Sequence, residues 1–168
     1  EAKEKTEEIE KSFVINKYLQ NRDYLIYGAN ENSPPVRFVD TDGVYKGVVV
    51  DYMSLLALEL GVEIRTEPYK WEDALQNLRE GKTDICDMYI NDERARDYVF
   101  TDPIYNLRTG LIAMADTAFT FDDINTMCIG TERGDYANYY MEKNFPDAEL
   151  RYVGNVEEGI GLLIEEEV

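Results

Sequence analysis

Apolar residues recur every three or four positions in several stretches of the chain, which predicts amphipathic helices. The predicted helices cover residues 2–19, 52–60, 71–80, 136–144 and 156–167. Gly61 and Gly81 directly follow two of these stretches, and glycine often ends a helix because it adopts left-handed backbone angles without strain. Asp51 directly precedes the second stretch. We expect it to be the N-cap, where a carboxylate accepts hydrogen bonds from the first N–H groups.

Short runs rich in β-branched and aromatic residues alternate with these helices and predict strands. The expected strands cover residues 24–27, 36–39, 62–66, 83–90, 127–130 and 150–153, and residues 107–115 form an extended, β-rich connector. Alternation of strands and helices is typical of an open α/β sheet. The DTDG run at 40–43 lacks the later acidic ligands of a calcium loop, so we expect a hairpin turn there.

The charge balance excludes one class of partner. The chain has 17 Lys and Arg against 35 Asp and Glu, for a net charge of −18. Nucleic-acid binding draws most of its affinity from cations that meet phosphates, and the sequence has no basic stripe to supply them. The same field repels anionic lipid surfaces, and no apolar run reaches the roughly 18 residues that span a bilayer. We therefore expect no nucleic-acid partner and no direct membrane binding by this segment.

Histidine is absent from the sequence, which removes several kinds of chemistry. No imidazole is present to act as the base for a Ser or Cys nucleophile or to ligate zinc. Cys86 and Cys128 lie far apart in mostly apolar stretches, which favours two small buried residues over a disulfide. Carboxylate chemistry stays open because acidic residues are abundant. We expect no catalytic residue, no metal ligand and no cofactor.

Three segments occur in an order that resembles the bacterial extracellular solute-binding proteins, family 3, which have the type 2 periplasmic-binding (Venus-flytrap) fold. The segments read YGANENSPPVRFVDTDGVYKGVVVDYMSLLALELG, WEDALQNLREGKTDICDMYINDERARDYVFTDPIY and IGTERGDYA. The resemblance covers residues 24–168. It implies an α/β clamshell of two lobes that close over a small polar solute, often an amino acid, held in the cleft between them.

The resemblance also implies the domain organisation. An N-terminal helix covers residues 1–21, lobe 1 covers residues 22–110, and a hinge strand with part of lobe 2 covers residues 111–168. A single strand–helix–strand–helix unit after residue 115 has too few strands for a stable sheet. We therefore expect the second lobe to be incomplete within this sequence.

Two candidate ligand-binding residues match the pattern of the family. Trp71 matches a position where the family places an aromatic wall against the solute. Arg94 matches the arginine that grips the carboxylate of the solute, a role that suits a guanidinium because it offers two parallel N–H donors. The residues alone favour a core residue at the start of a helix for Trp71 and a surface arginine paired with an acid for Arg94, and it is the resemblance that favours the ligand-binding roles.

Three positions depart from that pattern. The expected strand before Arg94 carries Asp87 and Tyr89, where amino-acid-binding members have small hydroxyl residues. Asp87 either faces an ammonium group of the solute or pairs with Arg94, because two facing anions would repel. Ser33 stands where many members carry an aromatic lid, so one wall of the site is missing.

Asp135 lies at the start of the helix predicted over residues 136–144, where the family often has Ser or Thr. It either contacts the solute or acts as a plain N-cap. The expected ligand-binding residues are thus Ser33, Trp71, Asp87, Tyr89, Arg94 and Asp135.

We expect an extracytoplasmic domain, periplasmic or at the cell surface, that is tethered to the membrane in the full-length protein. The leading hypothesis is the sensor domain of a membrane-anchored histidine kinase or cyclic-dinucleotide enzyme, because the N-terminal helix enters lobe 1 without a flexible linker. The alternative is the substrate-binding receptor of an ABC uptake transporter, whose partner is a permease. A dehydratase on the same fold is a third hypothesis, with Asp87 as its one candidate acid. We expect no enzyme.

Overall fold

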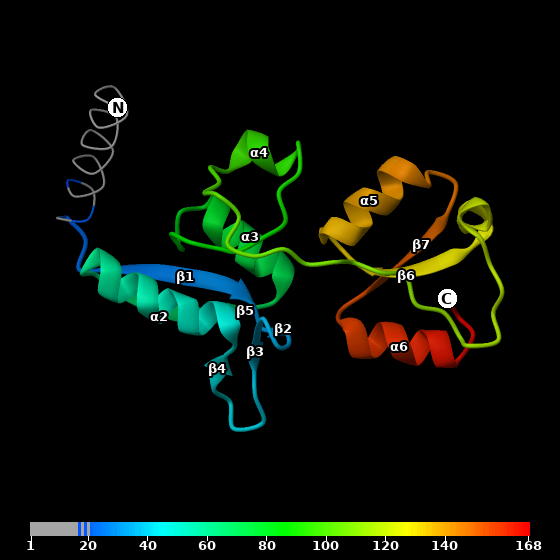
Figure 1. Ribbon diagram of the computed structural model, residues 1–168, viewed down its shortest axis with the longest axis horizontal. Coiled ribbons are helices and arrows are strands. Elements are labelled where there is room, and N and C mark those ends of the chain that lie inside the picture. The colour runs from blue at the N-terminus through cyan, green and yellow to red at the C-terminus, as the bar shows by residue number, and fades with distance from the viewer. Residues whose placement is uncertain (1–16, 18, 20) are drawn as a thin grey trace. The chain divides into compact units, whose positions relative to one another are not determined.

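The computed structural model describes residue 17, residue 19 and residues 21–168. The helix predicted over residues 2–19 falls almost entirely outside these residues and stays a prediction. Contacts between residues divide the chain into two compact units, Glu1–Asp87 (unit 1) and Met88–Val168 (unit 2). Figure 1 shows the elements of both units along the chain. Contacts thus place the boundary after Asp87, earlier than the boundary expected from the resemblance, which lies after residue 110.

Unit 1 is built on two parallel strands, β1 (Tyr24–Asn30) and β5 (Glu63–Tyr69), which pair from Tyr24 opposite Glu63 to Asn30 opposite Tyr69. The strand β1 is buried at most of its positions, as expected for a parallel strand covered by helices. Parallel strands joined through a helix confirm the predicted α/β class.

The strand expected over residues 83–90 is wrong. Within this stretch only Ile85 pairs with the sheet, through one isolated parallel bridge to Tyr27. The Asp84 carboxylate accepts a 2.9 Å hydrogen bond from the N–H of Ile26, so a side chain occupies a donor at the edge of β1. A ladder needs backbone groups on both sides, and pairing therefore does not extend beyond the bridge.

Two helices of unit 1 pack on this pair of strands: α2 (Val48–Leu60) contacts β5, and α3 (Trp71–Arg79) contacts β1 and β5. The expected N-cap at Asp51 is wrong, because α2 begins after Gly47. The first two N–H groups of α2 donate to the carbonyl oxygens of Pro35 and Val36, at 3.2 and 3.0 Å. These backbone acceptors satisfy donors that a carboxylate would otherwise cap.

A small antiparallel sheet completes unit 1. Its strands are β2 (Asn32–Ser33), β3 (Arg37–Val39) and β4 (Tyr45–Lys46), in that order. The turn between β3 and β4 is the expected hairpin at residues 40–43. The Asp40 carboxylate accepts hydrogen bonds of 2.9 Å from the N–H groups of Asp42 and Val44. An ion pair with Lys46 and these N–H groups lower the pKa of Asp40.

Unit 2 repeats the strand–helix order on a smaller scale. Its elements are α4 (Arg94–Asp97), the 3-10 helix η1 (Phe121–Thr126), β6 (Cys128–Glu132), α5 (Tyr136–Asn144), β7 (Glu149–Val153) and α6 (Val156–Ile164). Strands β6 and β7 pair in parallel, as the sequence predicts. Residues 107–115 have no strand partner among the described residues, so the expected hinge strand is not formed.

The core of unit 2 consists of apolar side chains from η1, β6 and α5. Ile124, Ile129 and Met141 are buried, and Phe145 and Leu150 pack against them. This cluster fixes β6 against α5, and thereby the turn at residues 133–135 that joins them. Among the described residues, no helix combines the length and the apolar character that crossing a bilayer requires.

Candidate functional site

Arg94 is the first residue of α4 and is buried, with 8% of its surface exposed. Its guanidinium donates from Nη1 to the carbonyl oxygen of Tyr89 at 2.9 Å and from Nη2 to that of Gly134 at 2.6 Å. Its backbone N–H donates to Oδ1 of Asn91 at 2.8 Å. Arg94 therefore connects the end of the 83–90 stretch to the turn before α5.

The rings of Tyr89 and Tyr136 stack on each other. Their centroids are 4.8 Å apart and their planes differ by 28°. Both side chains are half-buried, and the Tyr89 hydroxyl lies 3.3 Å from Oγ1 of Thr109. The predicted site residue Tyr89 thus lies close to Arg94 through its carbonyl and to α5 through its ring.

Asp135 is the N-cap residue of α5, but its carboxylate makes no capping hydrogen bond. The turn is instead held by Asn138, which is buried. The Gly134 N–H donates to Oδ1 of Asn138 at 3.1 Å, and Nδ2 of Asn138 donates to Glu142 at 2.8 Å. Capping of α5 by the side chain was one of the two alternatives expected for Asp135. The structure does not show this capping bond.

Asp87 lies in a buried polar cluster of unit 1. Its Oδ1 accepts a 2.6 Å hydrogen bond from the Tyr27 hydroxyl, and its Oδ2 lies 2.7 Å from Nη1 of Arg37. Burial and the Asp87 carboxylate raise the pKa of Tyr27 well above its ordinary value. Tyr45 stacks on Tyr27 at 6.4 Å, and its own pKa is raised by burial. Asp87 is therefore bonded to side chains of both β1 and β3.

Ser33 and Trp71 belong to different elements of unit 1. Ser33 ends β2 and is half-buried. Its carbonyl oxygen accepts a 2.9 Å hydrogen bond from the N–H of Val36. Trp71 begins α3 and is 5% exposed. Burial to this degree suits both an aromatic wall and a core residue, so the role of Trp71 stays a prediction.

Sequence reasoning missed four residues of these clusters: Tyr27, Arg37, Tyr136 and Asn138. Arg37 carried one signal, since it is the single charge in the run VRFV and alternation places it on the same face of a strand as Val39. Tyr136 directly follows the predicted Asp135, but no sequence pattern pairs it with Tyr89. Contacts such as the Tyr89–Tyr136 stack join residues that are distant in the sequence, so local sequence patterns do not reveal them.

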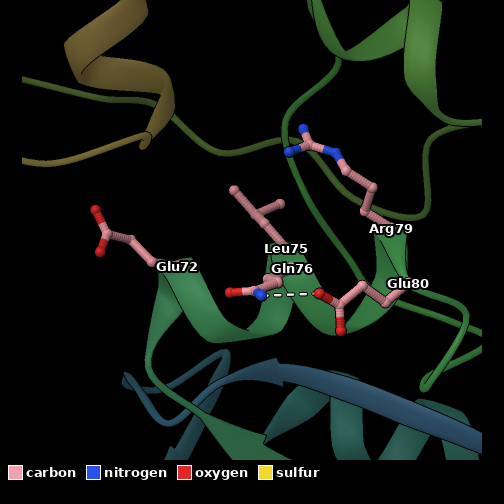
Figure 2. A pocket seen from close by; sticks show the side chains of 5 residues that line it. All are labelled: Glu72, Leu75, Gln76, Arg79 and Glu80. Carbon is pink, nitrogen blue, oxygen red and sulfur yellow. Dashed lines mark hydrogen bonds between the residues drawn. The ribbon is translucent and has the colours of Figure 1, made fainter.

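A pocket of about 420 Å³ opens on α3 (Figure 2). Its described lining consists of Glu72, Leu75, Gln76, Arg79 and Glu80. Gln76 donates a 2.8 Å hydrogen bond to Glu80 across its floor. Two carboxylates and one guanidinium are thus among the groups that line this pocket. In the described part of the chain, no cluster of Cys, Asp and Glu is arranged to hold a metal ion.

Comparison with known families identifies the class of protein. The model of the bacterial extracellular solute-binding proteins, family 3, matches residues 25–165. The chain belongs to this family. The resemblance found in the sequence is thereby confirmed, and with it an extracellular solute-binding class of protein.

Two curated relatives of this family 3 chain are binding proteins. L-cystine-binding protein TcyJ of Escherichia coli (strain K12) is 29% identical over 145 residues, which cover 82% of this chain and 53% of the relative. ABC transporter arginine-binding protein 1 of the same strain is 26% identical over 123 residues, which cover 72% of this chain and 51% of the relative. The family 3 chain thus spans about half the length of the curated relatives it matches.

Solved structures confirm the fold of the family 3 chain. The ancestral amino-acid-binding protein AncCDT-1, a precursor of cyclohexadienyl dehydratase, is 26% identical, with a TM-score of 0.77 over 92% of this chain and 72% of that one. The arginine-bound form of truncated ArgBP from T. maritima is 23% identical, with a TM-score of 0.78 over 90% and 74%. The expected type 2 periplasmic-binding fold is confirmed.

Proposed function

We propose that this family 3 chain is part of the substrate-binding receptor of an ABC uptake transporter and captures a small amino-acid-like solute outside the cytoplasm. The relatives support the proposal, since one is named for L-cystine binding and another is an ABC transporter protein named for arginine binding. The partner in this proposal is a membrane permease. The ligand-binding residues in the proposal are Ser33, Trp71, Asp87, Tyr89, Arg94 and Asp135.

The observation that carries the proposal is the buried guanidinium of Arg94. Burying a cation is costly unless hydrogen bonds compensate it, and the acceptors of Arg94 include two neutral carbonyl oxygens, those of Tyr89 and Gly134. A solute carboxylate is a stronger acceptor for a guanidinium than a carbonyl oxygen, and it binds with bidentate geometry. Arg94 therefore suits the capture of an amino acid by its carboxylate.

The sensor-domain hypothesis depends on the N-terminal helix, which lies outside the described residues. The names of the relatives favour the transport receptor instead. Transport would be supported by a permease gene beside the gene for this protein. It would also be supported if the ATPase activity of the reconstituted transporter in proteoliposomes rises when the solute-loaded protein is added. A kinase or cyclic-dinucleotide domain in the same polypeptide would support sensing.

A binding role also fits the position of Asp87 better than the dehydratase hypothesis does. The Asp87 carboxylate is engaged by Arg37 and Tyr27, whereas a general acid needs to reach the reacting group of its substrate. The curated relatives are binding proteins, and the neighbour AncCDT-1 is itself described as amino-acid-binding. We therefore propose that the chain binds its solute without converting it.

The proposal is tested by isothermal titration calorimetry of the purified protein against L-arginine, L-cystine, L-glutamine and L-leucine. We expect at least one to bind, and Arg94→Ala to weaken its binding about 100-fold or more, because losing a desolvated charge pair costs several kcal/mol. Arg96→Ala is the matched control, since Arg96 is an exposed arginine of the same short helix. Absence of binding by the folded protein, or equal effects of the two substitutions, would overturn the proposal.

A further inference from the structure

We propose that Asn138 is a positioning residue for Arg94, and that Glu142 supports it. In this inference Asn138 sets the turn that presents the Gly134 carbonyl oxygen to the Arg94 guanidinium. The turn thereby keeps the guanidinium in place for the carboxylate of the solute. The inference rests on the proposed function and extends the candidate set by two residues that act through Arg94 rather than by touching the solute.

The Arg94 guanidinium is bonded to a turn that is distant in the sequence. Its 2.9 Å contact with the Tyr89 carbonyl oxygen is local, because the two residues are five positions apart. Its shorter contact, at 2.6 Å, reaches the Gly134 carbonyl oxygen, 40 positions further along the chain. Gly134 has a φ of 72°, and glycine adopts positive and negative φ about equally readily. The conformation of this turn is therefore not fixed by the glycine itself, and contacts from elsewhere have to hold it.

Asn138 supplies such a contact. Its Oδ1 accepts a 3.1 Å hydrogen bond from the Gly134 N–H. Asn138 is 7% exposed, and Met141, almost one turn further along α5, lies in the core of unit 2. The acceptor is therefore carried by a helix that the core holds in place. Asp135, the N-cap residue, makes no side-chain capping bond, so the usual tie at a helix start is not used here.

Glu142 determines which way round the Asn138 amide points. Nδ2 of Asn138 donates a 2.8 Å hydrogen bond to Oε1 of Glu142, and the Tyr152 hydroxyl donates to the same oxygen at 3.3 Å. An ionised carboxylate only accepts hydrogen bonds, so it selects the NH2 side of the amide and leaves the amide oxygen facing Gly134. Hydrogen bonds therefore connect Glu142, through Asn138 and the turn, to the Arg94 guanidinium.

Positioning affects affinity because a guanidinium binds a carboxylate through two parallel N–H groups, which requires a defined orientation. A side chain that is already held in its bound orientation loses less conformational freedom when the ligand arrives. Without the Asn138 contact, the turn and the Arg94 guanidinium can take other conformations. Part of the binding free energy is then used to order them.

The first test is isothermal titration calorimetry with the amino acid that the wild-type protein binds most tightly. We expect Asn138→Ala to weaken binding about tenfold, which corresponds to the loss of one buried hydrogen bond. Glu142 is exposed, and Glu142→Ala should weaken binding by a smaller factor of about three. Asn155→Ala is the matched control, because Asn155 also accepts a backbone N–H at a helix start of unit 2. It should leave the affinity unchanged.

A double-mutant cycle shows whether Asn138 acts through Arg94. A residue that only supports the fold weakens binding by the same factor with or without the guanidinium. We expect Asn138→Ala to reduce the affinity much less in the Arg94→Ala background than in the wild-type background, because no guanidinium is left to position.

An exchange that keeps the net charge tests the hydrogen bonds themselves. Asn138→Asp alone brings two carboxylates together and should weaken binding, because they repel each other. Combined with Glu142→Gln, it restores a donor and an acceptor in the reverse order and keeps an oxygen for the Gly134 N–H. We expect the double variant to bind within about threefold of the wild-type protein.

The outcomes separate this inference from the proposed function. Wild-type affinity in Asn138→Ala, or an equal loss with and without Arg94, would overturn the positioning role and leave the receptor proposal standing. So would a double exchange that binds no better than Asn138→Asp alone. If Asn138→Ala does not fold, Glu142→Ala and the exchange decide. If no amino acid binds to the folded protein, or if Arg94→Ala binds as tightly as the wild type, both proposals are wrong.

Discussion

Asp87 and Arg37 form an ion pair inside unit 1, in which 2.7 Å separates the carboxylate Oδ2 from the guanidinium Nη1. The two side chains are only 5% and 10% exposed. Arg37→Met leaves the Asp87 carboxylate buried without this partner, so we expect the free energy of unfolding to fall by about 3–5 kcal/mol. Urea denaturation measures the change.

A double substitution tests whether the loss comes from the stranded charge. Arg37→Met combined with Asp87→Leu removes both charges, and we expect it to cost less than the sum of the two single substitutions. Arg65→Met is the exposed control, because the Arg65–Glu63 pair on β5 is 49% and 58% exposed. Its effect should be much smaller. Strict additivity of the Arg37 and Asp87 substitutions would contradict the coupling.

The buried hydroxyl of Tyr27 leads us to expect that the protein loses stability at alkaline pH. Its pKa is raised above the ordinary value of 10.0 by burial and by Asp87. Its contribution to stability is fully present below pH 10 and is lost as pH rises further, because the unfolded chain releases that proton first. The slope from one such group is at most about 1.4 kcal/mol per pH unit. Urea midpoints should therefore fall more steeply above pH 10 in the wild-type protein than in Tyr27→Phe. Equal slopes would show that Tyr27 ionises normally in the folded state.

Substitutions at Gly43 and Gly47 distinguish the cost of backbone strain from the cost of a steric clash. Both have positive φ angles, 132° at Gly47 and 76° at Gly43. A Cβ atom at Gly47 would lie 2.5 Å from the carbonyl oxygen of Val36, whereas nothing lies within 4 Å of a Cβ at Gly43. We expect Gly43→Ala to cost about 1 kcal/mol and Gly47→Ala about 3 kcal/mol or more in thermal or urea unfolding. Similar losses at the two positions would show that the start of α2 moves to make room.

The starts of α5 and α6 in unit 2 differ in their caps. Oδ1 of Asn155 accepts a 2.8 Å hydrogen bond from the N–H of Glu158 at the start of α6, whereas Asp135 makes no capping bond at the start of α5. Asn155→Ala should therefore lower the free energy of unfolding by about 1 kcal/mol, and Asp135→Ala by much less, both measured without solute. The reverse order would show that Asp135 caps α5 in solution.

Helical periodicity predicted α3 and α5 well, because an amphipathic face is a local property of the sequence. The start of α2 could not be predicted from local residues, since Pro35 and Val36 supply its acceptors from an earlier loop. The 83–90 stretch has the composition of a strand, but the Asp84 side chain bonds to β1 in place of a ladder.

The candidate site residues likewise divide into those that the sequence pointed to and those that only the tertiary structure reveals. The resemblance pointed to Arg94, and the structure gives it a buried position with backbone acceptors at Tyr89 and Gly134. Neither alternative considered for Asp87 from the sequence included Arg37, with which it forms an ion pair. A pair separated by 50 residues is recorded only in the tertiary structure.

Trp71 is the chain's one tryptophan, and it is buried at the start of α3. Fluorescence excited in the indole band therefore comes from a single place in unit 1, without any label. Circular dichroism, in contrast, averages over the helices of both units. When the two signals are followed through the same denaturation, coincident curves mean one cooperative transition, and separated curves mean that the units unfold independently.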